Sequence, residues 1–575
     1  MVTPEKFQKC VLCPDNAYCY GGNFITPLAG FYRKDNESID VTQCIAAKAC
    51  LGTNDLPITN LTSDEQINGV CAEGNYGKLC FYCEKNYGKS DEGEFCQTCN
   101  EINTLVYGRI VLIAILLICY ILLNSKFSEV DKKNNNYENS SVFLKIVINH
   151  SQHISILVSY LDYTLGGIEQ FFNLSSYCSL SNDDVLNNDC LINGIYYNPE
   201  FLFVVKIITN NLLPVIFTLL SFIFWVVFSL KKHHYKSDDL FGIFKSKSTF
   251  FLVLSIFIFY PLMTTSCLNL LDCIHLNSTE SVKYLKESPN IQCWDTEHLD
   301  FIIFICVPGI IFWGFAFPLF LFYVLSKNTN TLKSMAQQVS LKKEDDSLSH
   351  NGVSLKIQIE KKSTDTLENA ANENAFKCQP FSKYSSKKST SKQITETQRL
   401  SIIKRTKTFS FFYKGFSDKY YYWECMIFFR KFILIFFSTL NETDLDELKR
   451  LFLIGFLSVF YFITLSARPY KHRISNFMEM FSLLTCIFTV IVSVLTTSGI
   501  SDSAKSAYFV LCIIMNTIFY LLAVSFISYD AYKSSHNLIK SKIKTIATKK
   551  MNQLEKQSTI HKNPQLENNN AFNIK

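Results

Sequence analysis

The sequence predicts an all-α polytopic membrane bundle of about nine transmembrane helices, preceded by a small disulfide-rich module on the extracellular side. Three observations indicate this fold class. Hydrophobic residues make up 48% of the 575 residues and charged residues only 18%, and the 50 Phe fall mainly in long apolar runs. Ten of the 21 cysteines lie within the first hundred residues. Lys and Arg cluster in alternate loops between the apolar runs, as in membrane proteins with basic cytoplasmic loops.

Residues 1–104 are predicted to form the cysteine-rich extracellular module. This segment has almost no long apolar run, so it cannot build a sufficient core without cross-links, and disulfides form in an oxidising compartment. The spacing leaves the pairing open. The candidates for disulfides in this module are Cys10, Cys13, Cys19, Cys44, Cys50, Cys71, Cys80, Cys83, Cys96 and Cys99.

The last four of these cysteines also have a spacing that suits zinc. Cys80-x2-Cys83 and Cys96-x2-Cys99 would bring two thiolate pairs to one tetrahedral ion. Nearby glycosylation sequons, six further cysteines and an extracellular location favour disulfides instead. We therefore predict no metal site in the chain.

Apolar stretches predict nine membrane spans, because about 20 apolar residues in a helix cross a hydrocarbon core of roughly 30 Å. The span 142–162 is interrupted by polar residues that share about a third of the helix circumference. It is predicted to turn this polar face away from lipid, the alternative being an amphipathic helix on the membrane surface. The nine predicted spans are 105–124, 142–162, 201–230, 249–271, 299–326, 421–440, 450–468, 476–498 and 506–529.

The loop charges orient the chain. With nine spans and the N-terminus outside, the loops that carry Lys or Arg clusters are cytoplasmic, as is the C-terminus. The domains are then spans one to five in 105–326, a cytoplasmic linker 327–420, spans six to nine in 421–530 and a basic cytoplasmic tail 531–575. The Lys- and Ser-rich linker is predicted to be disordered, and its basic-aromatic portions, like the tail, suit anionic lipid headgroups or cytoplasmic partners.

The outward loops contain further candidates for modification. We predict that Cys178 pairs with Cys190 to close the loop 163–200, and that Cys267, Cys273 and Cys293 are also available for disulfides. N-glycosylation sequons fall outside under this topology. They lie at Asn36, Asn60, Asn173, Asn277 and Asn441.

Ionisable side chains inside the hydrocarbon are costly, so they are candidates for function. Arg430 and Lys431 lie about 14 Å inside the span 421–440. Glu424 or Glu479 could pair with Arg430, and Lys206 could pair with Asp300. A buried ion pair that fixes helix register is the structural alternative to a role in permeation or gating. The intramembrane polar candidates are Lys145, Asn149, Gln152, Lys206, Asn210, Asp300, Glu424, Arg430, Lys431 and Glu479.

Several motifs together resemble a known group of proteins. The run from Cys71 to Gly88 looks like an EGF-type ending, and the run from Cys10 to Gly30 with the following GFYR resembles the ephrin-receptor-like repeat. Followed by LKIVINHSQ, IQCWDTEH, YYWECMIFFRK and ARPYKHRISNFMEMFSL, this order is similar to a family of multi-pass transmembrane proteins of ciliates and other protists. The membrane block is faintly similar to transient-receptor-potential-like channels, although a convincing pore loop is missing.

The resemblance implies that the module ends a longer ectodomain. The chain begins MVTPEKFQKC without an apolar leader, so either the span 105–124 is a reverse anchor or the chain is the C-terminal part of a longer protein, which we favour.

For function, we expect a plasma-membrane protein whose bundle is channel-like or transport-like and whose module senses an extracellular ligand or ion. Alternatives are a surface receptor or adhesion protein with a non-conducting bundle, and a lipid-handling protein. The sequence has no enzyme motif and no cofactor-binding motif, and its charge reflects basic membrane loops, not nucleic-acid binding.

Overall fold

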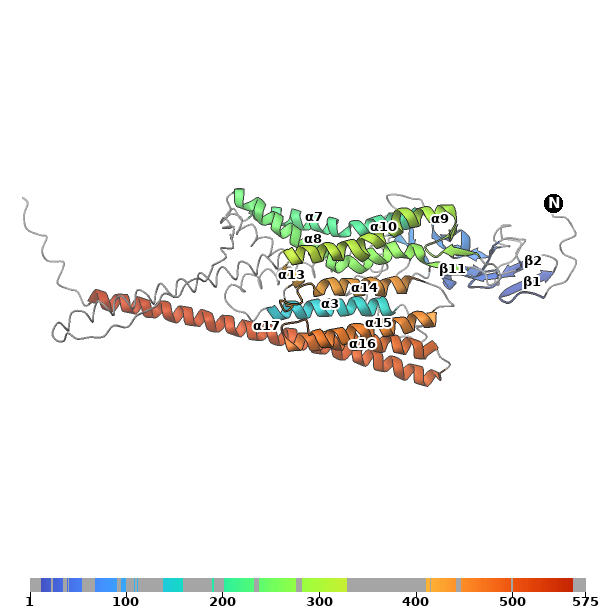
Figure 1. Ribbon diagram of the computed structural model, residues 1–575. Helices are drawn as coiled ribbons and strands as arrows, with labels where there is room; N and C mark the ends of the chain where they lie inside the picture. Colours follow the sequence, from blue (N-terminus) through green and yellow to red (C-terminus); the bar gives the residue numbers. More distant parts are fainter. Residues whose placement is uncertain are drawn as a thin grey trace, which may run out of the picture.

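The computed structural model describes most of the cysteine-rich module and most of the helical bundle (Figure 1). The described residues are 12–21, 24–34, 41–53, 68–89, 95–99, 138–158, 189–190, 201–231, 237–275, 282–327, 410–413, 415–440, 446–497 and 500–561, with a few single positions. The predicted span 105–124, the predicted sequons and most of the linker 327–420 lie outside them, as do Cys10 and Cys178.

The cysteine-rich module is a series of short antiparallel hairpins. This is expected for a segment in which disulfides take the place of a large hydrophobic core. Its two-stranded sheets are β1–β2, β3–β4, β5–β6, β7–β8 and β9–β10. The strands are β1 (Ala17–Gly21), β2 (Phe24–Pro27), β3 (Phe31–Arg33), β4 (Val41–Gln43), β5 (Cys50–Gly52), β6 (Val70–Cys71), β7 (Asn75–Tyr76), β8 (Tyr82–Cys83), β9 (Tyr87–Lys89) and β10 (Cys96–Thr98).

Disulfides staple the module at short intervals. The pairs within it are Cys13–Cys19, Cys44–Cys50, Cys71–Cys80 and Cys83–Cys96. A further pair, Cys99–Cys190, joins the module to the loop before α7. All four cysteines with zinc-like spacing are therefore oxidised and leave no thiolate for an ion.

The predicted pair Cys178–Cys190 is wrong, because Cys190 is bonded to Cys99. Gly88 explains how the loop reaches the module. A Cβ at this position would lie 2.6 Å from Sγ of Cys190, so glycine permits the close approach of β9 to the loop. The disulfide therefore links residues 189–190 to the module, and Cys190 is not available to pair with Cys178.

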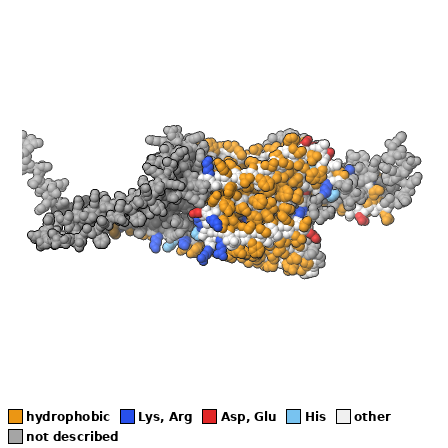
Figure 2. All heavy atoms as spheres, in the orientation of Figure 1, with side chains coloured by type: hydrophobic (Ala, Val, Ile, Leu, Met, Phe, Trp, Pro, Cys, Tyr) orange, Lys and Arg blue, Asp and Glu red, His pale blue; other side chains and the backbone are white. Residues whose placement is uncertain are grey.

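Among the described residues, six helices are long and apolar enough to cross a membrane. Two of them form the antiparallel pair α7 (Leu202–Lys231) and α8 (Ser237–Leu268), and the third is the helix from Thr296 to Lys327. The other three are α15 (Asp446–Ala467), α16 (Arg473–Thr497) and the start of α17 (Asp502–His561). Figure 2 shows the broad apolar band that they present, so the chain is a multi-pass membrane protein in contact with lipid.

The helix from Thr296 to Lys327 is continuous but irregular. It consists of α9 (Thr296–Phe301), the π-helical turn η6 (Ile302–Cys306), α10 (Val307–Gly309) and the π-helical segment η7 (Ile310–Ala316), and helical residues continue to Lys327. Pro308 interrupts the hydrogen-bond ladder, and wider π turns accommodate such interruptions.

The expected nine spans are not confirmed. The predicted spans 142–162 and 421–440 correspond to α3 (Glu138–Val158) and α14 (Trp423–Thr439), which do not reach the length and apolar composition of the other six. The physical reason is that both are interior helices. Lys145 of α3 and Arg430 of α14 are each 1% exposed, so neither helix needs a lipid-compatible surface over its whole length. The alternative of a surface helix at 142–162 is also wrong.

A three-stranded sheet covers the bundle at the end that carries the module. It consists of β11 (Cys273–His275), β12 (Lys283–Leu285) and β13 (Ser288–Gln292), and the disulfide Cys273–Cys293 closes it. Cys267, another predicted disulfide candidate, forms no disulfide. It is buried in α8, where it packs against Gly309.

The linker ends earlier than predicted. Residues 410–413 form the short helix α13 (Ser410–Tyr413), and Phe412 and Phe416 are 1% and 2% exposed. Phe416 also forms an isolated β-bridge with Tyr470 in the loop before α16. Phe412 and Phe416 are therefore part of the bundle core, although they follow a Lys-rich stretch of sequence.

Candidate functional site

Five charged side chains lie together inside the bundle, and we call them the charge cluster. They come from α3 and from two helices that both pack against it, α14 and α16. Each is 0% or 1% exposed, so all are removed from water and from lipid. The members of the charge cluster are Lys145, Glu424, Arg430, Lys431 and Glu479.

Two ion pairs account for four of the five charges. Nζ of Lys145 lies 2.8 Å from Oε2 of Glu424, which joins α3 to α14. Nη2 of Arg430 lies 2.8 Å from Oε1 of Glu479, which joins α14 to α16. The sequence left both carboxylates open as partners of Arg430. The structure selects Glu479 because Glu424 lies one and a half turns toward the start of α14, next to Lys145.

Lys431 has a different environment. Its Nζ donates a hydrogen bond of 2.7 Å to Oδ1 of Asn149. The same nitrogen lies 4.6 Å from the ring centroid of Phe257 and 5.4 Å from that of Phe428. Aromatic faces attract cations but do not neutralise them. With the two carboxylates already paired, the charge cluster therefore carries one surplus positive charge when all five groups are ionised.

Two histidines of α3 extend the polar interior. Nδ1 of His150 lies 2.9 Å from Oγ of Ser482 on α16, and its Nε2 lies 3.2 Å from Oδ1 of Asn516 on α17. Nε of Arg430 donates to Nε2 of His153 at 3.3 Å. Neither histidine was among the residues predicted from the sequence. His153 lies four residues after Asn149 on the same helical face, and this spacing was a signal that could have found it.

Several buried polar atoms of α3 have no hydrogen-bond partner among the described residues. They are Nδ2 of Asn149, Oε1 of Gln152 and Nδ1 of His153. Gln152 does use its amide nitrogen, which donates to the backbone carbonyl of Ile258 on α8 at 2.9 Å. A buried polar group without a partner costs about 1–3 kcal/mol, so such groups mark places where a protein binds water or another polar species.

A second polar group of residues joins the module to the bundle. Lys206 of α7 forms an ion pair with Asp189, and the backbone N–H of Lys89 in β9 lies 3.4 Å from the other carboxylate oxygen. Burial alone would raise the pKa of Asp189, but the Lys206 ammonium and the Lys89 contacts outweigh it and hold this pKa below its usual value. The expected pair Lys206–Asp300 is wrong, because Lys206 pairs with Asp189 and Asp300 is exposed near the end of α9.

The module also contacts the outer sheet directly. Nζ of Lys78 donates to the carbonyl of Pro289 at 3.0 Å and lies 3.5 Å from the ring centroid of Tyr284. The hydroxyl of Tyr82 lies 2.9 Å from Oγ of Ser288. A cavity of about 30 Å³ remains at this junction, lined in part by Tyr82, Asp189 and Lys206. This space suits a water molecule and is far below the volume of an organic ligand.

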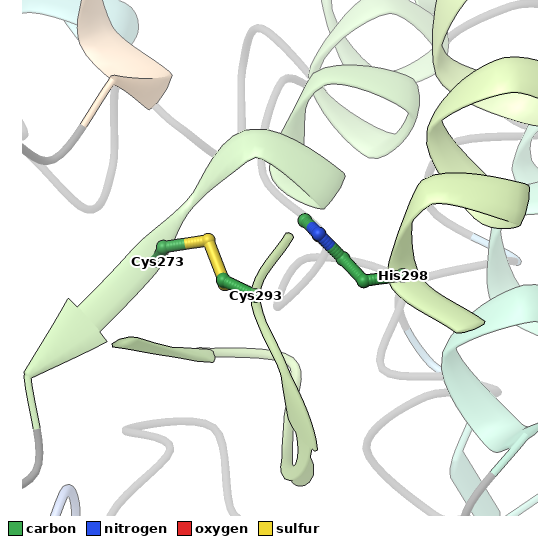
Figure 3. A group of neighbouring side chains, drawn as sticks. All are labelled: Cys273, Cys293 and His298. Atoms are coloured by element: carbon green, nitrogen blue, oxygen red, sulfur yellow. A yellow bond between two sulfur atoms is a disulfide. The ribbon is translucent and has the colours of Figure 1, made fainter. Parts of the chain in front are cut away.

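A group of residues at the outer sheet has the residue types of a metal site, but its side chains are not available as ligands. Cys273, Cys293 and His298 lie close together (Figure 3). The two sulfurs are bonded to each other. Nδ1 of His298 accepts from the backbone N–H of Trp294 at 3.0 Å, and its Nε2 lies 2.9 Å from the carbonyl of Leu270. The sulfurs and both ring nitrogens are engaged, so the group is structural.

The remaining candidates are separate from the charge cluster. Asn210 of α7 is buried at 3% exposure, on the same helix as Lys206. Its neighbour Asn211 accepts a 2.9 Å hydrogen bond from Nε1 of Trp313 and so ties α7 to the helix 296–327. The five predicted glycosylation sites, Asn36, Asn60, Asn173, Asn277 and Asn441, fall outside the described residues.

Comparison with known proteins gives one relative. The chain is 20% identical to cysteine repeat modular protein A of Toxoplasma gondii in an alignment of 605 positions, gaps included, that covers 89% of this chain and 17% of that protein. The chain therefore spans about a sixth of the length of this relative. No family model and no solved structure matches the chain.

Proposed function

We propose that this chain is a channel-like or transport-like membrane protein without enzymatic activity, in which the charge cluster handles ions and the cysteine-rich module senses conditions outside. The observation that carries the proposal is the buried amine of Lys431, which contacts an amide oxygen and two aromatic rings while both carboxylates of the charge cluster pair with other residues. Ionisable groups inside membrane proteins are costly and concentrate on ion pathways and proton relays. Two ion pairs would have been enough to fix the packing of α3, α14 and α16, whereas Lys431 adds a charge that no carboxylate of the cluster balances.

The polar atoms around Lys431 support the same reading. Asn149 holds the amine through Oδ1, while its Nδ2 and the nearby Nδ1 of His153 have no partner among the described residues. Amide, imidazole and ammonium groups together can bind water or a small ion. In the described conformation all these groups are buried, so conduction would require α3 or α14 to move.

The proposed orientation places the module outside and the end of α17 in the cytoplasm, in the plasma membrane. The six disulfides lie in the module and the outer sheet at one end of the bundle, which suits an oxidising exterior, whereas the five free cysteines of the described residues are buried. Lys and Arg side chains gather at the other end of the apolar band (Figure 2), which suits the cytoplasm.

The experiment is whole-cell recording in a heterologous host with surface labelling of each variant. Lys431→Met removes the surplus charge but retains much of the length of the side chain. Lys471→Met, at an exposed position in the loop before α16, is the matched control. We expect a current that Lys431→Met changes by tenfold or more, or alters in selectivity, and that Lys471→Met leaves unchanged.

A surface receptor with a non-conducting bundle is the second candidate, and one observation favours it. The module is fastened to the bundle by Cys99–Cys190, by Asp189 and by Lys78, so a ligand that moves the module would also move α7 and the outer sheet. If surface-expressed chain carries no current, the receptor replaces the channel as the best-supported function. Lipid handling has less support, because the polar side chains of α3 face the bundle interior and not the lipid.

A further inference from the structure

The last helix continues far beyond the membrane. The apolar part of α17 ends at Lys533, but the helix itself ends at His561. The added residues extend it by about 42 Å at 1.5 Å per residue. This extension points away from the bundle at the end opposite the cysteine-rich module (Figure 1).

The extension presents exposed apolar side chains at helical spacing. Ile539 and Ile543 of the extension are 57% and 61% exposed, and Tyr532, at the end of the apolar part, is 71% exposed. Position 532 lies seven residues before 539, and 543 lies four residues after it, so the three share one face of the helix. In the sequence Ile546 continues this series, which gives isoleucines at i, i+4 and i+7. Large apolar residues repeated at this spacing are the anchors by which a helix binds in a groove.

The same extension is strongly basic. Residues 533–561 contain seven Lys and one Glu. By helical spacing, positions 533, 540 and 544 fall on one side of the apolar face, and positions 542, 549 and 556 fall on the other. The seventh lysine, Lys550, falls on the apolar face itself and ends the stripe after Ile546. An apolar stripe with lysines on both sides predicts a partner with an apolar floor and acidic rims.

Charge decides between the possible partners. A second copy of the extension would bring the same surplus of lysines to the interface, and like charges at an interface disfavour association. A lipid surface attracts basic residues only within about one Debye length, roughly 8–10 Å. Because α17 is one continuous helix that runs on from its own span, the stripe extends away from the membrane and does not lie in the membrane plane, as the apolar face of a surface helix does. It therefore cannot bury its apolar side chains in the bilayer in this conformation.

We infer that residues 534–549 are a docking helix for an acidic protein that binds amphipathic helices in an apolar groove. This proposal does not depend on conduction by the bundle. Calcium-loaded calmodulin has this chemistry, and its grooves open only when Ca²⁺ is bound, so it serves as the probe.

The test uses the full chain in nanodiscs of zwitterionic lipid, with calmodulin binding measured by interferometry. We expect binding in Ca²⁺ that is lost on chelation and weakened at least tenfold by the double substitution Ile539→Ser with Ile543→Ser. Leu538→Ser, at a position on another face of the helix, is the control and should change the affinity less than threefold. The stripe is exposed, so the variants should elute as the wild type does on size exclusion.

Four outcomes would overturn the proposal. The first is no calmodulin binding by the full chain, and the second is binding that the double substitution does not weaken. The third is calmodulin binding that appears only after the segment 327–409 is deleted, which would mean that this segment itself covers the stripe. The fourth is an apolar face that is used only for self-association, or that engages only nanodiscs containing phosphatidylserine, which would assign it to a second copy or to the membrane.

Discussion

Arg430 on α14 and Glu479 on α16 form an ion pair of 2.8 Å in the interior of the bundle. The hydroxyl of Tyr470 donates to the second oxygen of the same carboxylate at 3.2 Å. Both charged side chains are 1% exposed, so the pair is held in a medium of low dielectric where a lone charge is costly. The ion pair thereby joins α14 to α16.

Breaking this pair should destabilise the protein more than replacing it. Arg430→Met or Glu479→Met alone leaves one buried charge without a partner, at a cost of about 3–5 kcal/mol each. The double variant removes both charges, so its loss should be clearly smaller than the sum of the single losses. The free energy of unfolding in detergent, from denaturant titration, measures all three. Strictly additive losses would show that the two side chains do not interact.

A close approach between Gly314 and Phe432 should be sensitive to a single methyl group. A Cβ at Gly314 would lie 2.6 Å from Cζ of Phe432, so Gly314→Ala should lower the stability by about 1–3 kcal/mol through overpacking. Adding Phe432→Leu should recover part of the loss. Gly455→Ala in α15 is the control, because its Cβ would meet nothing within 4 Å. We expect no loss there, since Ala is the better helix former. Equal effects at both glycines would contradict the packing.

The disulfide that joins the module to the bundle can be mapped directly. Digestion of the non-reduced protein followed by mass spectrometry should give a peptide that contains Cys99 linked to one that contains Cys190. After cleavage at a protease site introduced within residues 100–104, Cys99→Ser should free the module from the bundle on a non-reducing gel, whereas the disulfide should keep it attached in the wild type. The double serine variant should behave as the single one does. Recovery of a peptide that links Cys178 to Cys190 would refute the connectivity.

The Asp189–Lys206 pair should make stability depend on pH in the acid range. The pKa of Asp189 is lower in the folded protein than its ordinary value. A depressed pKa contributes stability that is fully present above the unfolded value of about 3.9 and is lost as the pH falls through the folded value.

Melting temperatures from pH 7 to pH 2.5 test this dependence. Asp189→Asn should lower the melting temperature at pH 7 and flatten the curve below about pH 4. Glu297→Gln, at an exposed carboxylate on α9 at the same end, should keep the wild-type curve. If Asp189→Asn keeps the wild-type slope below pH 4, the pair does not stabilise the junction.

The membrane character was predictable from sequence because lipid imposes a simple rule on length and composition. That rule locates helices such as α8 and α16, whose apolar runs are nearly unbroken. It weakens for α3 and α14, because interior helices exchange lipid contact for contacts with other helices and can then carry Lys145 or Arg430. The number of spans depends on these two helices and on residues outside the described ones.

Partners within the site were harder to predict than its members. The candidates Lys145, Glu424, Arg430, Lys431 and Glu479 were identified because a charge in an apolar run is conspicuous. Which carboxylate meets which cation depends on how α3 and α16 rotate around α14, and helical periodicity in one chain does not specify this. The same reason explains the error at Cys190, since its partner lies 91 positions away in a module whose placement the spacing does not encode.

The central claim is that the surplus charge at Lys431 acts on ions that pass through the bundle. The most direct measurement is the reversal potential of the purified full chain in planar bilayers under a tenfold KCl gradient. We predict a current in the wild type, and Lys431→Met should shift the reversal potential toward the potassium equilibrium potential, because removing a buried positive charge favours cations. Bilayers that contain the protein but carry no current, or a reversal potential identical in the two proteins, would contradict the account.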